Sequence, residues 1–103
     1  MVQEVKTMAE YQQILADNKY VCVDYFATWC GPCRMIAPKI QEFEGKYGNV
    51  KFIKVDVDQA TDIAEKEGIS AMPTFKFFTN GERSGEVIGA SEAKIKEELE
   101  KCK

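Results

Sequence analysis

The sequence predicts an α/β fold with one mixed sheet of five strands flanked by four helices, in the order βαβαβαββα. Strand and helix patterns alternate through the first two thirds of the chain, which favours parallel strands joined by right-handed crossovers. Asn80-Gly81 then separates two strand-like runs, a strong signal for an antiparallel hairpin. A last helical pattern follows the hairpin. A chain of 103 residues is expected to form a single domain, residues 1–103.

The first strand, the first helix and the second strand are predicted from sequence patterns of different strength. Val2–Val5 is a weak strand candidate, and Thr7 with Glu10 has the spacing of a capping box at a helix start. Tyr20–Phe26 is a nearly continuous apolar run, as expected for a central strand covered on both faces. The apolar residues of the first helix, at helical spacing, are Met8, Tyr11 and Leu15.

A second helix is predicted to begin at the pair Cys30 and Cys33 and to be ended by Gly48. Pro38 lies inside it and is expected to kink it, because proline removes a backbone hydrogen bond. Val50–Val57 follows as a strand. The inward face of the helix is predicted to consist of Cys33, Ile36, Ile40, Phe43 and Tyr47.

The last third of the chain is predicted to hold two strands and two helices. Asp58 is expected to cap a short third helix that Gly68 ends. The hairpin strands are Thr74–Thr79 and Glu82–Ile88, and the last helix begins near Ser91. Its inward side chains are predicted to be Ile95, Leu99 and Cys102.

The composition limits the classes of function. The net charge is −3, with no basic block, so a nucleic-acid partner is not expected. No apolar run reaches the ~18 residues of a membrane span. The first residues, MVQEVKTMAEYQQ, are too polar for a signal peptide, so we expect a cytoplasmic protein, and a monomer.

The cysteine pair in TWCGPCRM could belong to a zinc site, a structural disulfide or a redox couple. A structural zinc ion needs four ligands, and Cys22 and Cys102 lie singly in a chain without histidine, so no metal is expected. A disulfide that closes so short a loop removes little entropy from the unfolded chain.

The redox interpretation has a physical mechanism and is favoured. Pro32 suits the first turn of a helix, which places Cys30 at the helix N-terminus. Unpaired N–H groups and the helix dipole there stabilise a thiolate. Cys33 falls on the inward face and should be shielded. Cys30 is therefore predicted to attack a substrate disulfide, and Cys33 to resolve the mixed disulfide.

The segment YFATWCGPCRMIAP resembles the active-site segment of the thioredoxin family. VDVDQ, GISAMPTFKFF and NGE follow in the order found in thioredoxins, so the resemblance covers essentially the whole chain and is closest to the eukaryotic cytosolic type. It implies the thioredoxin fold and a protein disulfide reductase. Electrons would come from NADPH through thioredoxin reductase and pass to targets such as ribonucleotide reductase, peroxiredoxins or methionine sulfoxide reductases. The chain has no nucleotide-binding Gly-rich turn, so no cofactor is expected to bind to it.

Asp24 stands on the apolar strand, where burial of its charge should raise its pKa. It is either a charge at a strand end that faces water or, as the resemblance implies, a buried proton acceptor for Cys33. Lys54 matches the lysine that pairs with this aspartate in the family. For Met72–Pro73 the low frequency of cis X–Pro bonds favours trans, whereas the resemblance implies a cis peptide packed against the cysteine pair.

Several neighbours of the pair are substrate-binding candidates. Trp29 is either a core aromatic or an exposed platform beside Cys30, and Gly89-Ala90 is either a plain turn or part of the same groove. Gly31 is expected to let a substrate approach closely. Ala71, Met72 and Pro73 are expected to bind a substrate strand, with the peptide N–H before Pro73 free to pair with its backbone. Ala71 stands where many animal thioredoxins have a further cysteine.

For four further side chains the sequence predicts exposure, burial or a possible contact, but no catalytic role. Arg34 is expected to face solvent, and Cys22 to be buried and inert. Cys102 is a candidate for an intermolecular disulfide. Tyr25 stands where the family more often has phenylalanine, so its hydroxyl would need a partner if buried.

Two rival functions remain on the same fold. An oxidase or isomerase is disfavoured, because isomerase relatives place a histidine between the cysteines where this chain has Gly-Pro. The second rival is a redox-dependent binding or regulatory module, which can coexist with reductase activity.

Overall fold

The computed structural model of residues 1–103 has the element order and the mixed five-stranded sheet that the sequence predicts, and the strands are ordered β1-β3-β2-β4-β5. β1, β3 and β2 are parallel to one another, whereas β4 is antiparallel to β2 and β5 to β4. The elements are β1 Gln3–Glu4, α1 Met8–Asp17, β2 Tyr20–Phe26, α2 Gly31–Lys46, β3 Lys51–Asp56, α3 Thr61–Glu67, β4 Thr74–Thr79, β5 Glu82–Ile88 and α4 Glu92–Glu100.

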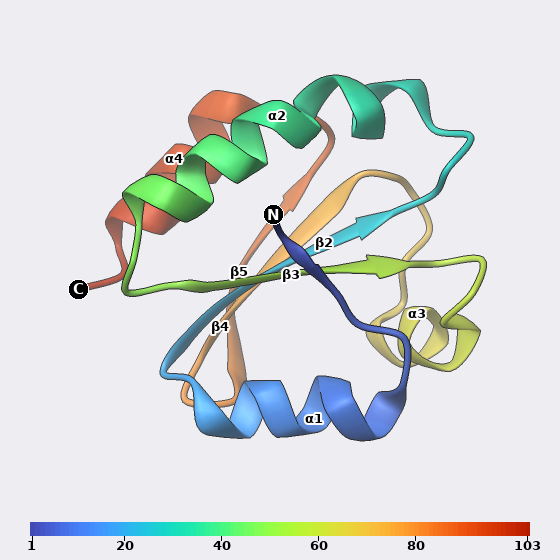
Figure 1. Ribbon diagram of the computed structural model, residues 1–103, viewed down its shortest axis with the longest axis horizontal. Coiled ribbons are helices and arrows are strands. Elements are labelled where there is room, and N and C mark those ends of the chain that lie inside the picture. The colour runs from blue at the N-terminus through green and yellow to red at the C-terminus, as the bar shows by residue number, and fades with distance from the viewer.

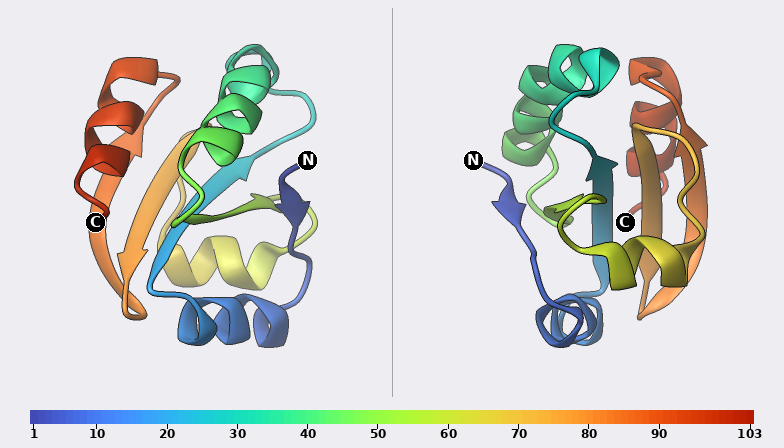
Figure 2. Two further views of the ribbon diagram at one scale, coloured as in Figure 1. Left: turned by 60° about the vertical axis from the view of Figure 1, so that its left-hand side comes forward. Right: turned by 90° about the vertical axis from the view of Figure 1, so that its right-hand side faces the viewer.

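Helices cover both faces of the sheet. Figures 1 and 2 show α2 and α4 on one face and α1 and α3 on the other. The core is divided in the same way: Cys22 packs in a cluster with α2 and α4, and Tyr25 in a second cluster with Tyr11 and Ile63. Side chains of a strand alternate between faces, so Asp24 lies on the Cys22 face, beneath α2. No helix combines the length and apolar composition needed to cross a membrane.

Three strands, β2, β4 and β5, agree residue for residue with the sequence prediction. The hairpin turn is also confirmed, because Asn80 (φ 54°) and Gly81 (φ 84°) both have positive φ, which such a turn requires. Gly68 (φ 68°) ends α3 in the left-handed conformation that was expected. At the start of α1, Thr7 Oγ1 accepts a hydrogen bond from the Glu10 N–H, so half of the capping box forms.

Two predicted helix boundaries are wrong. The residue before α3 is Ala60, with no side-chain cap, because the Asp58 carboxylate is instead hydrogen-bonded to Trp29. α2 ends at Lys46 rather than at Gly48, and its last backbone bond is donated by Tyr47 N–H to the Phe43 carbonyl. Gly48 does not adopt a positive φ, so burial of Tyr47, rather than glycine geometry, accompanies the end of the helix. α2 runs continuously through Pro38.

A buried polar cluster joins α1, β2 and α3 on the face opposite α2. The Tyr11 hydroxyl donates to Glu67 Oε2 at 2.7 Å and accepts from the Tyr25 hydroxyl at 2.5 Å. Both tyrosines are fully buried, and burial raises the pKa of both phenols, so they stay protonated. Lys76 Nζ donates to the Glu67 carbonyl. The partner that the Tyr25 hydroxyl needs is therefore present.

The two tyrosines are expected to differ in their effect on stability. Tyr11→Phe leaves the Tyr25 hydroxyl without an acceptor and Glu67 without its donor, which should lower the free energy of unfolding by about 1–3 kcal/mol. In Tyr25→Phe the Tyr11 hydroxyl still donates to Glu67, so no buried donor is left without a partner. The free energy of unfolding should therefore fall by less than about 1 kcal/mol. Urea unfolding measures both, and equal losses would contradict the direction assigned to these hydrogen bonds.

Candidate redox site at the start of α2

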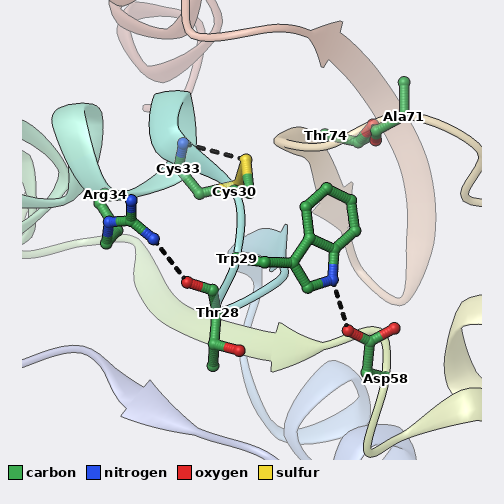
Figure 3. The surroundings of a disulfide bond; sticks show 8 residues. All are labelled: Thr28, Trp29, Cys30, Cys33, Arg34, Asp58, Ala71 and Thr74. Carbon is green, nitrogen blue, oxygen red and sulfur yellow. Dashed lines mark hydrogen bonds between the residues drawn. A yellow bond between two sulfur atoms is a disulfide. The ribbon is translucent and has the colours of Figure 1, made fainter.

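The two cysteines lie where the chain passes from β2 into α2. The Cys30 N–H donates to the Ala27 carbonyl and closes a tight turn, which brings Cys30 to the N-cap position of α2. Pro32 occupies the first turn of the helix, as predicted. Cys30 and Cys33 form a disulfide with a Cα–Cα distance of 5.3 Å. The N–H of Cys33 donates to Cys30 Sγ at 3.2 Å, a contact drawn in Figure 3. The helix N-terminus therefore directs a backbone donor at the sulfur that sequence reasoning assigned as nucleophile.

Burial alone does not distinguish the two sulfurs. Cys33 is shielded as expected, with 6% of its surface exposed, but Cys30 is equally buried at 4%. What separates them is their place relative to α2. Cys30 precedes the first turn and receives a hydrogen bond from it, whereas Cys33 lies inside that turn and supplies the donor. This asymmetry favours negative charge on the Cys30 sulfur.

Asp24 is buried beneath the disulfide, with 7% of its surface exposed, so a strand-end carboxylate that faces water is excluded. Its Oδ1 atom has no hydrogen-bond partner. Burial raises the pKa of Asp24 to about 7, and the positive charge of Lys54 lowers it in part. Because Lys54 is the neighbour of Asp24 in the β2–β3 register, its strand position is as the resemblance implied.

The expected pairing of Lys54 with Asp24 does not form as a direct ion pair. No salt bridge involves Lys54, and its ammonium lies over the Phe26 ring, 5.5 Å from the centroid. The aromatic face attracts the cation, while Asp24 is left without the partner. Lys54 thus acts on Asp24 through its charge at a distance.

A cavity of about 290 Å³ connects the carboxylate with the disulfide. Asp24, Cys33 and Lys54 all contribute to its wall. Its other lining residues are Phe26, Ala27, Thr28, Arg34 and Ala37. A space of this size has room for water, and the Asp24 oxygen without a partner is an acceptor to which a water molecule can donate. The cavity offers a route for a proton between Cys33 and Asp24.

The segment before β4 lies on the other side of the disulfide. The Met72–Pro73 peptide is cis, so the expectation from base rates is wrong and the one from the family is confirmed. Met72 packs against the cluster formed by Ala27, Cys30 and Cys33. The Pro73 carbonyl accepts from Gly89 N–H at 2.8 Å, and the Ala71 carbonyl from Thr74 Oγ1 at 2.6 Å. The N–H and C=O of Met72 make no backbone hydrogen bond, so they are available to an added strand.

Trp29 is exposed over 65% of its surface, which excludes a core aromatic. Its Nε1–H donates to Asp58 Oδ2 at 2.8 Å, so the ring is held beside Cys30 (Figure 3). Gly31 is clear of the rest of the protein, because a Cβ built on it would meet nothing within 4 Å. An external chain can therefore approach this turn without a clash.

The turn after β5 borders a second hollow beside the disulfide. Gly89 has φ 100°, a backbone conformation that L side chains rarely adopt, and it donates to the Pro73 carbonyl. Ala90 lines a hollow of about 400 Å³, whose other walls are Pro32, Met35, Ile36, Lys39 and Glu92. The structure thus brings the predicted residues from four separate segments of the chain together around the disulfide.

Sequence reasoning missed two contributors to the site. Asp58 was predicted as a helix cap, and its role in holding Trp29 has no local sequence signal. Arg34 faces solvent, as expected, but sequence reasoning missed that its Nη1 donates to the Thr28 carbonyl at 2.7 Å, across the start of the cysteine turn. Its position directly after Cys33 was the one signal that could have pointed to it.

The remaining cysteines lie apart from this site. Cys22 is buried, as expected, and burial holds the pKa of its thiol well above the usual value. Cys102 is partly buried, and its Sγ lies 3.7 Å from the Glu98 carbonyl oxygen. Burial also raises the pKa of the Cys102 thiol. Both thiols are therefore poor nucleophiles at neutral pH.

Comparison with known proteins agrees with this geometry. The family model described as thioredoxin matches residues 2–101. Thioredoxin-1 of Schizosaccharomyces pombe is 48% identical over 95 residues, which cover 92% of each chain. The solved structure of Plasmodium falciparum thioredoxin has a TM-score of 0.94 and 44% identity, with 97% of this chain and 98% of that one covered.

A chain from a structure on the thiol resolving mechanism of yeast mitochondrial 1-Cys peroxiredoxin via glutathione/thioredoxin systems is also similar. It has a TM-score of 0.94 and 31% identity, with 97% of this chain and 94% of that chain covered.

Proposed function

The chain belongs to the thioredoxin family and is a thiol-disulfide oxidoreductase, and from this premise we propose that it reduces protein disulfides. The observation that carries the proposal is a disulfide whose first sulfur accepts a hydrogen bond from the N-terminal turn of α2. A thiolate formed there is stabilised by the helix, so the reduced pair is favoured relative to a dithiol in water.

In the first step, the Cys30 thiolate attacks one sulfur of the target disulfide. A Cys30–target disulfide forms and the other target sulfur leaves as a thiolate. The unpaired N–H and C=O of Met72 would hold the target backbone as an added strand beside the disulfide. Trp29, Gly31, Ala71, Pro73, Gly89 and Ala90 surround this place and would complete the contact surface.

In the second step, Cys33 loses its proton and attacks Cys30 Sγ. The Cys30–Cys33 disulfide forms, and the second target sulfur leaves as a thiolate and takes up a proton. Asp24 is the acceptor for the Cys33 proton through the cavity that both residues line. A pKa of about 7 makes it a base of suitable strength at neutral pH, and Lys54 tunes it by its charge.

We further propose that NADPH, through a thioredoxin reductase, restores the dithiol. Target proteins would be ribonucleotide reductase, peroxiredoxins and methionine sulfoxide reductases. The similar chain from the peroxiredoxin study supports the second of these. We also propose a cytoplasmic, monomeric protein with a single domain, residues 1–103. A binding or regulatory role, independent of turnover, would be revealed by a partner that Cys30→Ser/Cys33→Ser still captures.

The redox equilibrium of the pair tests the reductase assignment. Trp29 is exposed beside Cys30, and it is the sole tryptophan, so its fluorescence should follow the opening of the disulfide in defined thiol buffers. We expect a midpoint near −270 mV, the approximate value of a thioredoxin-type reductant. A midpoint near about −180 mV would indicate an isomerase-like disulfide donor instead.

A further inference from the structure

Arg34 links the first turn of α2 to the segment that precedes Cys30. Its backbone N–H donates to the Cys30 carbonyl at 3.3 Å, and its side chain turns back so that Nη1 donates to the Thr28 carbonyl at 2.7 Å. Figure 3 shows the guanidinium directed at Thr28, on the other side of the cysteine pair from the Trp29 ring. The side chain thus spans the start of the turn that carries both sulfurs.

The same two residues form part of the wall of the Asp24 cavity. Arg34 and Thr28 line it together with Asp24 and Cys33, so their hydrogen bond ties two parts of one wall. The inner end of the cavity holds Asp24 Oδ1, a buried acceptor without a partner. The amount of water that reaches this atom is limited by the wall that faces outward. Its exposed members are Thr28, Arg34 and Ala37, and Arg34 is the one whose side chain is hydrogen-bonded across to another lining residue.

We propose that Arg34 closes this cavity through its bond to the Thr28 carbonyl and thereby acts as a positioning residue for proton transfer between Cys33 and Asp24. It touches neither a substrate nor the reacting sulfur. Its role is to keep the carboxylate under-solvated and the turn closed. The inference rests on the proposed proton transfer and adds a residue to it.

Two other groups that titrate or carry charge lie near Asp24, Lys54 on β3 and the buried Cys22 thiol on the same strand. Cys33 of α2 lines the same cavity but is held in the disulfide and does not titrate. From β4 the register partner is Phe75, which carries no charge. Burial is the largest cause of the raised pKa of Asp24, and the positive charge of Lys54 offsets it in part. Arg34 is therefore expected to act by excluding water more than by its charge.

The test compares the titration of the Asp24 carboxyl, read by carbon NMR in the oxidised protein, among variants at position 34. Arg34→Ala opens the wall, so the midpoint should fall by about 0.5 to 1 pH unit towards that of a solvated carboxylate. Arg34→Lys keeps a donor for Thr28 and should stay close to the parent. Lys96→Ala removes the same charge from an exposed site on α4 and serves as the matched control.

The possible results separate the alternatives. A role through charge alone would move the Arg34→Ala midpoint upward, because loss of a cation disfavours the carboxylate, and this would overturn the proposal. An unchanged midpoint would overturn it as well. The NMR titration needs no turnover, so it remains informative even if Asp24 proves unnecessary for reduction. As a second readout, the pH profile of mixed-disulfide release should shift in the same direction in Arg34→Ala and be restored in Arg34→Lys.

Discussion

Cys33→Ser is expected to abolish turnover and to trap target proteins covalently on Cys30. The serine hydroxyl cannot attack the mixed disulfide, so the complex persists until a thiol from solution resolves it. The native thiol is held within the same helix turn as Cys30 and reacts with a very high effective concentration. Loss of this advantage should slow release by about 10³-fold or more.

The trapping is read by mass spectrometry after non-reducing electrophoresis. Cys102→Ser is the matched control, since it removes a partly buried thiol of raised pKa that lies apart from the disulfide, and it should leave both turnover and trapping unchanged. Cys30→Ser should trap nothing, because the remaining Cys33 lies inside the first turn of α2 and lacks the backbone donor that stabilises a thiolate at Cys30. Target adducts on Cys102 in place of Cys30 would contradict the assignment of nucleophile and resolving thiol.

Asp24→Asn is expected to stabilise the oxidised protein at neutral and alkaline pH. In the unfolded chain this carboxyl ionises near 3.8, whereas in the folded protein it keeps its proton up to about 7. Between these values the folded state binds more protons, so the free energy of unfolding of the parent falls as pH rises. The accumulated loss is on the order of 4 kcal/mol above pH 7. The asparagine amide of Asp24→Asn has the same shape but does not ionise, so the variant avoids this loss of stability.

Urea unfolding at pH 4 and pH 8 measures this difference. At pH 4 the carboxyl is protonated in the folded protein and about half ionised in the unfolded chain, so the two proteins should differ by less than about 1 kcal/mol, whereas the variant should be clearly the more stable at pH 8. Glu97→Gln, which neutralises an exposed acid on α4, is the control and should show no such pH-dependent gain. Equal stability of parent and Asp24→Asn at both pH values would show that this carboxylate is solvated.

The same variant should be a slower reductase. Without an acceptor for the Cys33 proton, release of the reduced target is expected to slow by about 10²-fold. The deficit should be greatest from about pH 7, where Asp24 of the parent is ionised, to about pH 8.5, where a thiol ionises unaided. Single-turnover release from the mixed disulfide measures it, and an unchanged pH profile would remove Asp24 from the proton transfer.

Local patterns determined most of the fold of this protein. The apolar run Tyr20–Phe26 forms the central strand, and the Asn80-Gly81 turn sets the hairpin, because each signal depends on the residues themselves. Cys30 at a helix N-terminus was equally a local matter, since Pro32 favours a first turn directly after it. The boundaries that failed, at Asp58 and Gly48, are those where a contact with a distant residue or burial replaced the local signal.

The surroundings of the cysteine pair were decided by tertiary structure alone. Three features depend on how α2 packs on the sheet. They are the cavity between Asp24 and Cys33, the position of Lys54 over Phe26 and the hydrogen bond from Arg34 to the Thr28 carbonyl. The chemistry of the pair could be predicted because cysteine reactivity follows from its place on one helix. The raised pKa of Asp24 could be predicted in direction from its place on an apolar strand, but the size of the shift could not, because desolvation depends on every element that covers the carboxylate.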